Sequence, residues 1–201
     1  FVAFAPVRAE LAPTSPEAFF GYRLGADGRI ARWDRIVSYF ELLERQSEGR
    51  LRVLDMGPTT MGNPFLLVIV SSRNNLAHLD ELRAVNVRLA DPRGLEPVEI
   101  DRLVARGRVV ICQSMSLHAT EIGGTQMAPE LACDLLSRTD EEAARILDNV
   151  IFLLVPSFNP DGQVMVTDWY HKYRGSAYDG AALPWLYHKY AGHDNNRDAF
   201  Q

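Results

Sequence analysis

The sequence predicts an α/β fold in which a mixed β-sheet is flanked by helices on both faces. Two observations support this prediction. Short apolar runs alternate along the chain with longer segments whose apolar residues repeat at the helical spacing. In addition, 47% of the 201 residues are apolar, which is enough to fill a sizeable core. Strands that are separated by helices are typical of this fold class.

The first part of the chain predicts an arm, a helix and a hairpin. Residues 10–32 are rich in Pro, Gly and charge, which indicates an arm that leads into the domain. Asp34 is expected to cap a helix that ends near Gly49. Its apolar positions follow the 3.6-residue period: Ile36, Val37, Phe40 and Leu43. Leu51–Met56 and Phe65–Val70 are expected to be strands of a hairpin, because a Gly/Pro-containing turn connects them.

The rest of the chain predicts two further strands among helices. The expected elements are, in order, a helix capped by Asn74 or Asn75, a break at Asp91–Pro97, a short helix Val98–Ala105, a strand Val109–Ser114, helices Thr125–Ser137 and Asp140–Leu147, and a strand Val150–Val155. The strand Val109–Ser114 is short and apolar, as buried central strands are. After Trp169 the chain is rich in aromatic residues, which indicates either a surface loop held by its own packing or a lining for substrate.

Composition excludes some classes of function. The formal charge of -5 and the pI near 5.5 give no basic surplus, so a nucleic-acid partner has no electrostatic support. No apolar run approaches the roughly 20 residues that a membrane span requires. Cys112 and Cys133 are expected to be buried free thiols rather than a disulfide. Residues 1–9 resemble the tail of a signal peptide, so secretion or export to the periplasm is a hypothesis.

His118 and Glu121 form the central candidate site. They follow the expected strand Val109–Ser114 and stand three residues apart, so both side chains can turn toward one point. Zinc is commonly held by such a pair of ligands. Gly123 and Gly124 are expected to let the backbone turn sharply and pack closely where the next helix begins. A surface pair at a helix start has the same spacing, so this motif alone is weak evidence.

Two further motifs follow in order. They are Asn159-Pro160-Asp161-Gly162, just past the last expected strand, and Gly192-His193-Asp194-Asn195-Asn196-Arg197-Asp198. The carboxyl ends of strands carry the ligand site in such sheets. The three motifs together resemble the zinc carboxypeptidase family, from about Trp33 to the end of the chain.

The resemblance implies one zinc ion per complete site and a peptide or protein C-terminus as substrate. By position, His118 and Glu121 match the first two zinc ligands. Asn196 and Arg197 match the pair that binds the terminal carboxylate, and the planar guanidinium of an arginine suits that role. Arg174, twelve residues after Gly162, matches the arginine that stabilises the oxyanion. His193 is an alternative metal ligand, although the family does not use that position.

Some features depart from the family pattern. The family usually has Asn-Arg-Asn-Phe where this chain has Asn196-Arg197-Asp198-Ala199-Phe200, and Asp198 adds a negative charge. The family's third zinc ligand, a histidine, and its general-base glutamate lie downstream of this motif, whereas the chain ends at Gln201. We therefore expect residues 1–32 to be an arm and residues 33–201 to be the N-terminal part of a catalytic domain. An incomplete sheet would leave an exposed edge through which the chain could self-associate.

The predicted function is that of a zinc-dependent metallocarboxypeptidase, in which the 201-residue chain is inactive alone. Two alternatives remain open at this point. One is a zinc-dependent amidohydrolase of the same fold that acts on acyl amino acids, because a fold does not determine a function. The other is a binding module that keeps the scaffold without catalysis.

Overall fold

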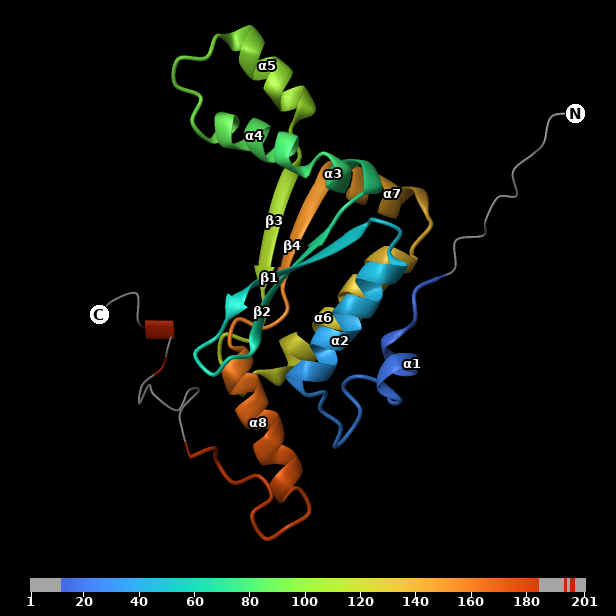
Figure 1. Ribbon diagram of the computed structural model, residues 1–201, viewed down its shortest axis with the longest axis vertical. Helices are drawn as coiled ribbons and strands as arrows, with labels where there is room; N and C mark the ends of the chain where they lie inside the picture. Colours follow the sequence, from blue (N-terminus) through green and yellow to red (C-terminus); the bar gives the residue numbers. More distant parts are fainter. Residues whose placement is uncertain (1–11, 185–193, 195, 198–201) are drawn as a thin grey trace, which may run out of the picture.

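The computed structural model describes residues 12–184, 194, 196 and 197, and its centre is a four-stranded mixed sheet (Figure 1). The strands are β1 (Leu51–Pro58), β2 (Pro64–Val70), β3 (Val109–Ser114) and β4 (Val150–Val155), in the order β1-β2-β4-β3. β1 and β2 form the expected antiparallel hairpin. β2 pairs antiparallel with β4, and β4 pairs parallel with β3.

Helices cover both faces of this sheet, as the sequence predicts. The helices are α1 (Pro16–Phe20), α2 (Trp33–Gln46), α3 (Arg73–Ala77), α4 (Leu79–Ala90), α5 (Pro97–Arg106), α6 (Ile122–Ser137), α7 (Glu141–Asn149) and α8 (Pro160–Tyr173). α2 and α6 pack on one face. On the other face Leu76, Leu79 and Leu82 pack against Ile69 and Ile151. Among the described residues no helix has the length and apolar character of a membrane span.

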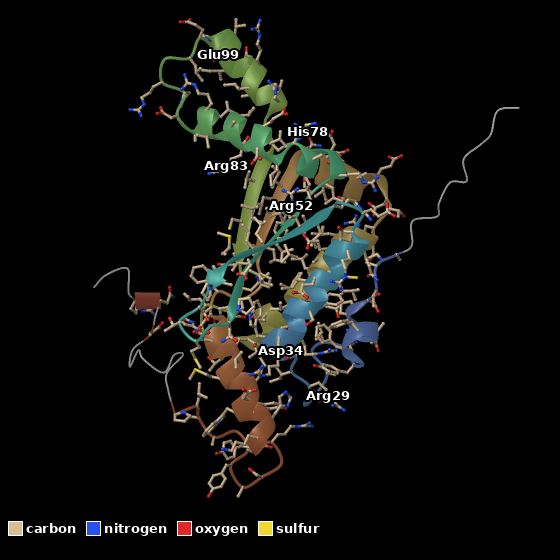
Figure 2. The ribbon with its side chains drawn as sticks, viewed as in Figure 1. Arg29, Asp34, Arg52, His78, Arg83 and Glu99 are labelled. Carbon is tan, nitrogen blue, oxygen red and sulfur yellow. The ribbon has the colours of Figure 1, made fainter. Side chains whose placement is uncertain are left out.

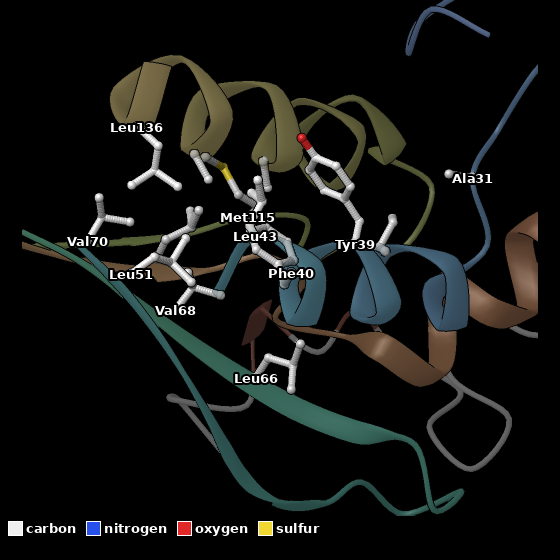
Figure 3. Packing of buried hydrophobic residues seen from close by; sticks show 14 of the residues in the cluster. Ala31, Tyr39, Phe40, Leu43, Leu51, Leu66, Val68, Val70, Met115 and Leu136 are labelled. Carbon is white, nitrogen blue, oxygen red and sulfur yellow. The ribbon is translucent and has the colours of Figure 1, made fainter. Parts of the chain in front are cut away.

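α2 supplies the main core contacts. Trp33, Tyr39, Phe40 and Leu43 are almost completely buried and recur along one side of this helix. They meet the inward side chains of the hairpin and the apolar side of α6 (Figure 3): Leu51, Leu66, Val68, Val70 and Leu136. Burial of such large side chains is the dominant favourable contribution to folding.

Buried amides hold the segment before α2 against α6 and α8. The backbone N–H of Ala31 donates to Gln126 Oε1 at 2.7 Å. The Ala31 carbonyl accepts from Gln126 Nε2 at 3.0 Å and from Gln163 Nε2 at 2.9 Å. At the surface beside these hydrogen bonds, Arg32 Nε lies 2.7 Å from Asp168 Oδ1. Because α8 follows β4 directly, these contacts fix the helix that leads away from the carboxyl edge of the sheet.

The described part of the N-terminal segment also contacts the core. Thr14 is hydrogen-bonded to Gln46, and Phe19 and Phe20 of α1 pack around the ring of Tyr39. Thr14, Phe19 and Phe20 thus lie against α2. The division between an arm and a domain at residue 32 stays a prediction.

Two predicted helix starts were wrong. Arg32, not Asp34, is the N-cap of α2, and Asp34 lies in its first turn. Ser72, not Asn74 or Asn75, caps α3, since its side chain accepts from the backbone N–H of Asn75. The Asn75 side chain is buried and donates to the Leu147 carbonyl, so tertiary packing decides its role.

β3 is an edge strand, which corrects the expectation of a buried central strand. Its six residues are all exposed, with Val109 60% and Ile111 45% exposed. Cys112 is therefore an exposed thiol, whereas Cys133 is buried as expected, and both are free. The free edge and the apolar side chains agree with the expected open sheet edge, but self-association through it stays a prediction.

α8 was not expected. The Asn159 side chain accepts from the backbone N–H of Gly162, Pro160 occupies the first turn, and Asp161 follows it. A capping side chain, proline and an acidic residue are together a recognised helix start. Trp169, Tyr170 and Tyr173 therefore belong to a helix rather than to a surface loop.

α4 and α5 lie at the opposite end of the sheet from α8 and carry charged side chains such as Arg83 and Glu99 (Figures 1 and 2).

We predict that Phe40→Ala lowers the free energy of unfolding by roughly 3–5 kcal/mol, because it removes a buried ring and leaves a cavity. Val87→Ala is the matched control, since Val87 is 63% exposed, and a change within about 0.5 kcal/mol is expected for it. Urea denaturation followed by circular dichroism measures both. Equal losses in the two variants would contradict the core described above.

Candidate metal and substrate site

The parallel pair β3–β4 brings two loops together at one edge of the sheet. Beyond the last paired residues, the backbone N–H of Met115 donates to the Val155 carbonyl at 3.0 Å. The backbone N–H of Phe158 then donates to the Met115 carbonyl at 2.7 Å. The loop that carries His118 and Glu121 therefore lies beside the Asn159-Pro160-Asp161-Gly162 turn, as the positions of both motifs past strand ends predict.

His118 contacts a carboxylate through each ring nitrogen. Nδ1 lies 3.1 Å from Glu121 Oε1, and Nε2 lies 2.8 Å from Asp194 Oδ1. The hydrogen bond to Glu121, and secondly that to Asp194, raises the pKa of His118. The pKa of Asp194 is lowered, chiefly by the hydrogen bond from the Asn196 backbone N–H and further by His118. The imidazole is thus held between two negative groups.

The geometry of this pair fits zinc. Two ligand atoms on a tetrahedral zinc ion, each about 2.1 Å from the metal, lie roughly 3.4 Å apart. The 3.1 Å between His118 Nδ1 and Glu121 Oε1 is close to this value. Metal-binding histidines usually engage a carboxylate through the other ring nitrogen, as Nε2 does with Asp194. In the described part of the chain, no three His, Cys, Asp or Glu side chains are grouped so as to hold a metal. The residues present therefore fit two positions of a zinc site.

Ser116 shapes the loop that presents His118. Its φ of 50° is uncommon for a residue other than glycine. Its Oγ donates to the Glu121 carbonyl at 2.7 Å and accepts from the Thr125 backbone N–H at 3.0 Å. A Cβ at Gly124 would lie 3.1 Å from this Oγ, so Gly124 permits the close approach expected from the sequence. Gly123 has open space around it, and both glycines lie inside α6.

Asp161 joins the hairpin tip to the start of α8. Its carboxylate accepts from the Thr59 hydroxyl, from Asn63 Nδ2 at 2.8 Å and from the Met61 backbone N–H at 3.0 Å. Asp161 is only 3% exposed, so these donors replace the water that its charge would otherwise require. The hairpin tip is thereby held at the same edge of the sheet as His118.

Asp194 also organises the candidate carboxylate-binding pair. Its Oδ1 accepts from the Asn196 backbone N–H at 2.9 Å, and its Oδ2 lies 3.6 Å from Arg197 Nη2. Asn196 and Arg197 are both exposed. Asp194 thus links His118 to this pair, although the segments are far apart in sequence. His193 and Asp198 lie outside the described residues.

Arg174 lies at the C-terminal end of α8, where it lines a cavity together with Thr120. It follows the last residue of α8, about 20 Å from the start of that helix at 1.5 Å per residue. Its Nη1 donates to the Gly28 carbonyl at 2.8 Å. Within the described ranges no hydrogen bond or ion pair is found between Arg174 and the other four predicted site residues. Its oxyanion role stays a prediction.

Sequence reasoning missed three residues that organise this edge: Ser116, Asp161 and Asp194. Asp161 and Asp194 stand inside the motifs, so their position was a usable signal. An aspartate such as Asp161 in a turn that starts a helix predicts a helix cap. Only the fold shows that the Asp161 carboxylate accepts hydrogen bonds from the tip of the β1–β2 hairpin. Ser116 carries no such signal, because its role depends on an unusual φ.

Comparisons with known proteins address the family and the fold of this chain. The family model described as zinc carboxypeptidase matches residues 36–201. No match is found among curated protein sequences. Among solved structures the chain is similar to thrombin activatable fibrinolysis inhibitor, with a TM-score of 0.50 and 12% identity. That similarity covers 78% of this chain and 30% of the other, and it shows the fold alone.

Two further solved structures are similar to this chain. Carboxypeptidase A from Helicoverpa armigera has a TM-score of 0.48 and 14% identity, over 75% of this chain and 32% of that one. A metallo-carboxypeptidase from Burkholderia cenocepacia has a TM-score of 0.36 and 18% identity, over 65% and 27%. This chain therefore spans about a third or less of the length of each protein.

We predict that Asp194→Asn weakens zinc binding by about 10-fold, because the amide lacks the charge that orients His118 and makes it more basic. Asp179→Asn is the control, since Asp179 accepts from the backbone N–H of Gly175 and no contact of it with His118 is found among the described residues. Competition with a chelating dye measures the affinity. Equal affinity in Asp194→Asn and in the unchanged chain would contradict this role.

Proposed function

Because the chain belongs to the zinc carboxypeptidase family, we propose that it contributes to a metallocarboxypeptidase that hydrolyses C-terminal peptide bonds. The observation that carries this proposal is the double contact of His118. One ring nitrogen faces Glu121 at zinc-ligand spacing, and the other contacts Asp194, which also pairs with Arg197. A metal-binding pair and a carboxylate-binding pair are thus joined through one aspartate.

His118 Nδ1 and Glu121 would hold the metal. When bound there, zinc supplies a Lewis acid that polarises a carbonyl and lowers the pKa of a water molecule. His118 must give up a proton from Nδ1 to act as a ligand, so metal binding releases that proton. Asp194 keeps Nε2 protonated as a hydrogen-bond donor and fixes the ring plane.

Asn196 and Arg197 would bind the terminal carboxylate of the substrate. A guanidinium offers two parallel N–H donors that match a carboxylate, and Asn adds a third. The Arg197 ion pair with Asp194 is 3.6 Å long and exposed on the arginine side, so most of its donors are available. Fixing the free carboxylate orients the last peptide bond and restricts cleavage to chain ends.

Arg174 would stabilise the negative charge that develops on the carbonyl oxygen. For this role its guanidinium must leave the Gly28 carbonyl, which it contacts through Nη1. The contact is exposed, so breaking it costs little. This step makes the assignment of Arg174 depend on a rearrangement.

We further propose that the 201 residues do not hydrolyse peptides by themselves. Two protein ligands hold zinc more weakly than three, and the family's third ligand and general base have no counterpart that matches in this chain. The chain covers only 30% of the first similar structure, which supports a requirement for further residues.

The test compares the 201-residue chain with a longer product of the same gene. Both are loaded with zinc, and zinc per chain is measured by mass spectrometry together with the intact mass. Blocked dipeptides and N-acyl amino acids are then offered as substrates. Hydrolysis of dipeptides by the longer protein alone supports the proposal. Turnover by the 201-residue chain contradicts its inactivity, and a preference for N-acyl amino acids favours the amidohydrolase instead.

We predict that Arg197→Lys in the longer protein raises KM for blocked dipeptides at least about 10-fold with a smaller change in kcat, because lysine lacks the bidentate geometry. Arg83→Lys on α4 is the control, at the other end of the sheet. Steady-state kinetics measures both. An unchanged KM would exclude Arg197 from carboxylate binding.

A further inference from the structure

A cavity opens beside the loop that carries His118 and Glu121. Its volume is about 220 Å³, and its lining includes Thr120, which stands between His118 and Glu121 in the sequence. The remaining wall comes from α8 and from the segment that follows it, which turns back along the helix (Figure 1). The cavity therefore reaches the loop that carries both predicted zinc ligands, at a residue two positions after His118 and next to Glu121.

The wall of this cavity is mostly aromatic and apolar, and its charged members are Arg174 and Asp179. α8 contributes Val166, Trp169 and Tyr173, and the returning segment contributes Tyr178 and Leu183. The Trp169 and Tyr173 rings lie 4.4 Å apart, and the Tyr173 and Tyr178 rings meet edge to face at 5.9 Å. Trp169 Nε1 donates to the Ala181 carbonyl at 2.9 Å, which fixes the indole and ties the returning segment to α8.

The sequence left open whether these aromatic residues pack on one another or line a substrate site. The rings do pack on one another, but their packing leaves a space instead of filling it. Apolar cavities of about 150 Å³ hold a benzene molecule, so 220 Å³ is large enough for a benzyl group. Edge-to-face ring contacts would add to the burial of an aromatic guest.

We propose that this cavity is a substrate subsite that binds an aromatic side chain of the peptide on the N-terminal side of the bond to be cleaved. This inference rests on the proposed function. Neither Asn196 nor Arg197 is among the described residues that line the cavity, so the terminal carboxylate would be bound elsewhere. A chain held there by its end and passing the metal-binding pair places an earlier side chain beside Thr120.

The cavity is tested first without catalysis. N-acetylphenylalanine amide and N-acetylalanine amide, which lack a carboxylate, are titrated into the 201-residue chain, and the indole N–H signal of Trp169 is followed by NMR. Trp169→Phe assigns that signal. We expect the phenylalanine probe to bind roughly 10-fold more tightly, as burial of a benzyl group predicts. No saturable shift with this probe would overturn the subsite.

Two variants locate the binding. Ala182→Phe fills the cavity from the returning segment, and Ala177→Phe adds the same ring on that segment outside the lining. We expect the first to abolish the preference for the phenylalanine probe and the second to keep it. Unchanged thermal unfolding confirms that both variants fold. Loss of the preference in both variants, or in neither, contradicts the assignment.

Steady-state kinetics tests the subsite and the proposed function independently. The zinc-loaded longer protein is given acetyl-Phe-Leu and acetyl-Ala-Leu, and kcat/KM is compared. A ratio of about 10 that falls to about 1 in Ala182→Phe supports the subsite. Hydrolysis without this preference overturns the subsite and leaves the peptidase intact. Binding of the amide probe without hydrolysis of either dipeptide overturns the peptidase and leaves an aromatic-binding cavity.

Discussion

The parallel pairing of β3 with β4 is the constraint on which the candidate site depends. It joins Ser114 and Val155 at the carboxyl edge of the sheet, and the backbone bonds of Met115 continue the alignment beyond the last pair. Two loops from distant parts of the sequence consequently emerge side by side. Since β2 runs antiparallel to β4, the hairpin tip reaches the same edge. A different strand order would separate His118 from the turn that starts α8.

Charge at this edge is distributed through two aspartates with different surroundings. Asp161 is buried and accepts hydrogen bonds from donors of the hairpin tip, so its charge holds the hairpin against the start of α8. Asp194 is partly exposed and divides its oxygens among His118, Asn196 and Arg197. A single carboxylate thereby orients the imidazole of His118, the proposed zinc ligand, and restrains the guanidinium of Arg197.

α8 connects the scaffold with the aromatic cavity. Its first turn is capped by Asn159, its middle is tied to Ala31 through Gln163, and its last turns carry Trp169 and Tyr173. The returning segment is attached to this helix through the indole of Trp169. Part of the cavity wall therefore belongs to a helix whose position is determined by buried contacts. A wall held in place in this way favours a defined preference for one kind of substrate side chain.

The sequence by itself determined the α/β class, the hairpin, both parallel strands and the position of His118 and Glu121 at a strand end, because apolar periodicity and turn residues act locally. It also contained the Asn159-Pro160-Asp161 signal for α8, which was not recognised as a helix start. Only the tertiary structure decided that β3 lies at an edge, that Asp194 contacts His118, and that Arg174 contacts Gly28. The contact of Asp194 with His118 spans 76 residues of sequence, and that of Arg174 with Gly28 spans 146. No local preference encodes such contacts, since they arise from packing of the whole core.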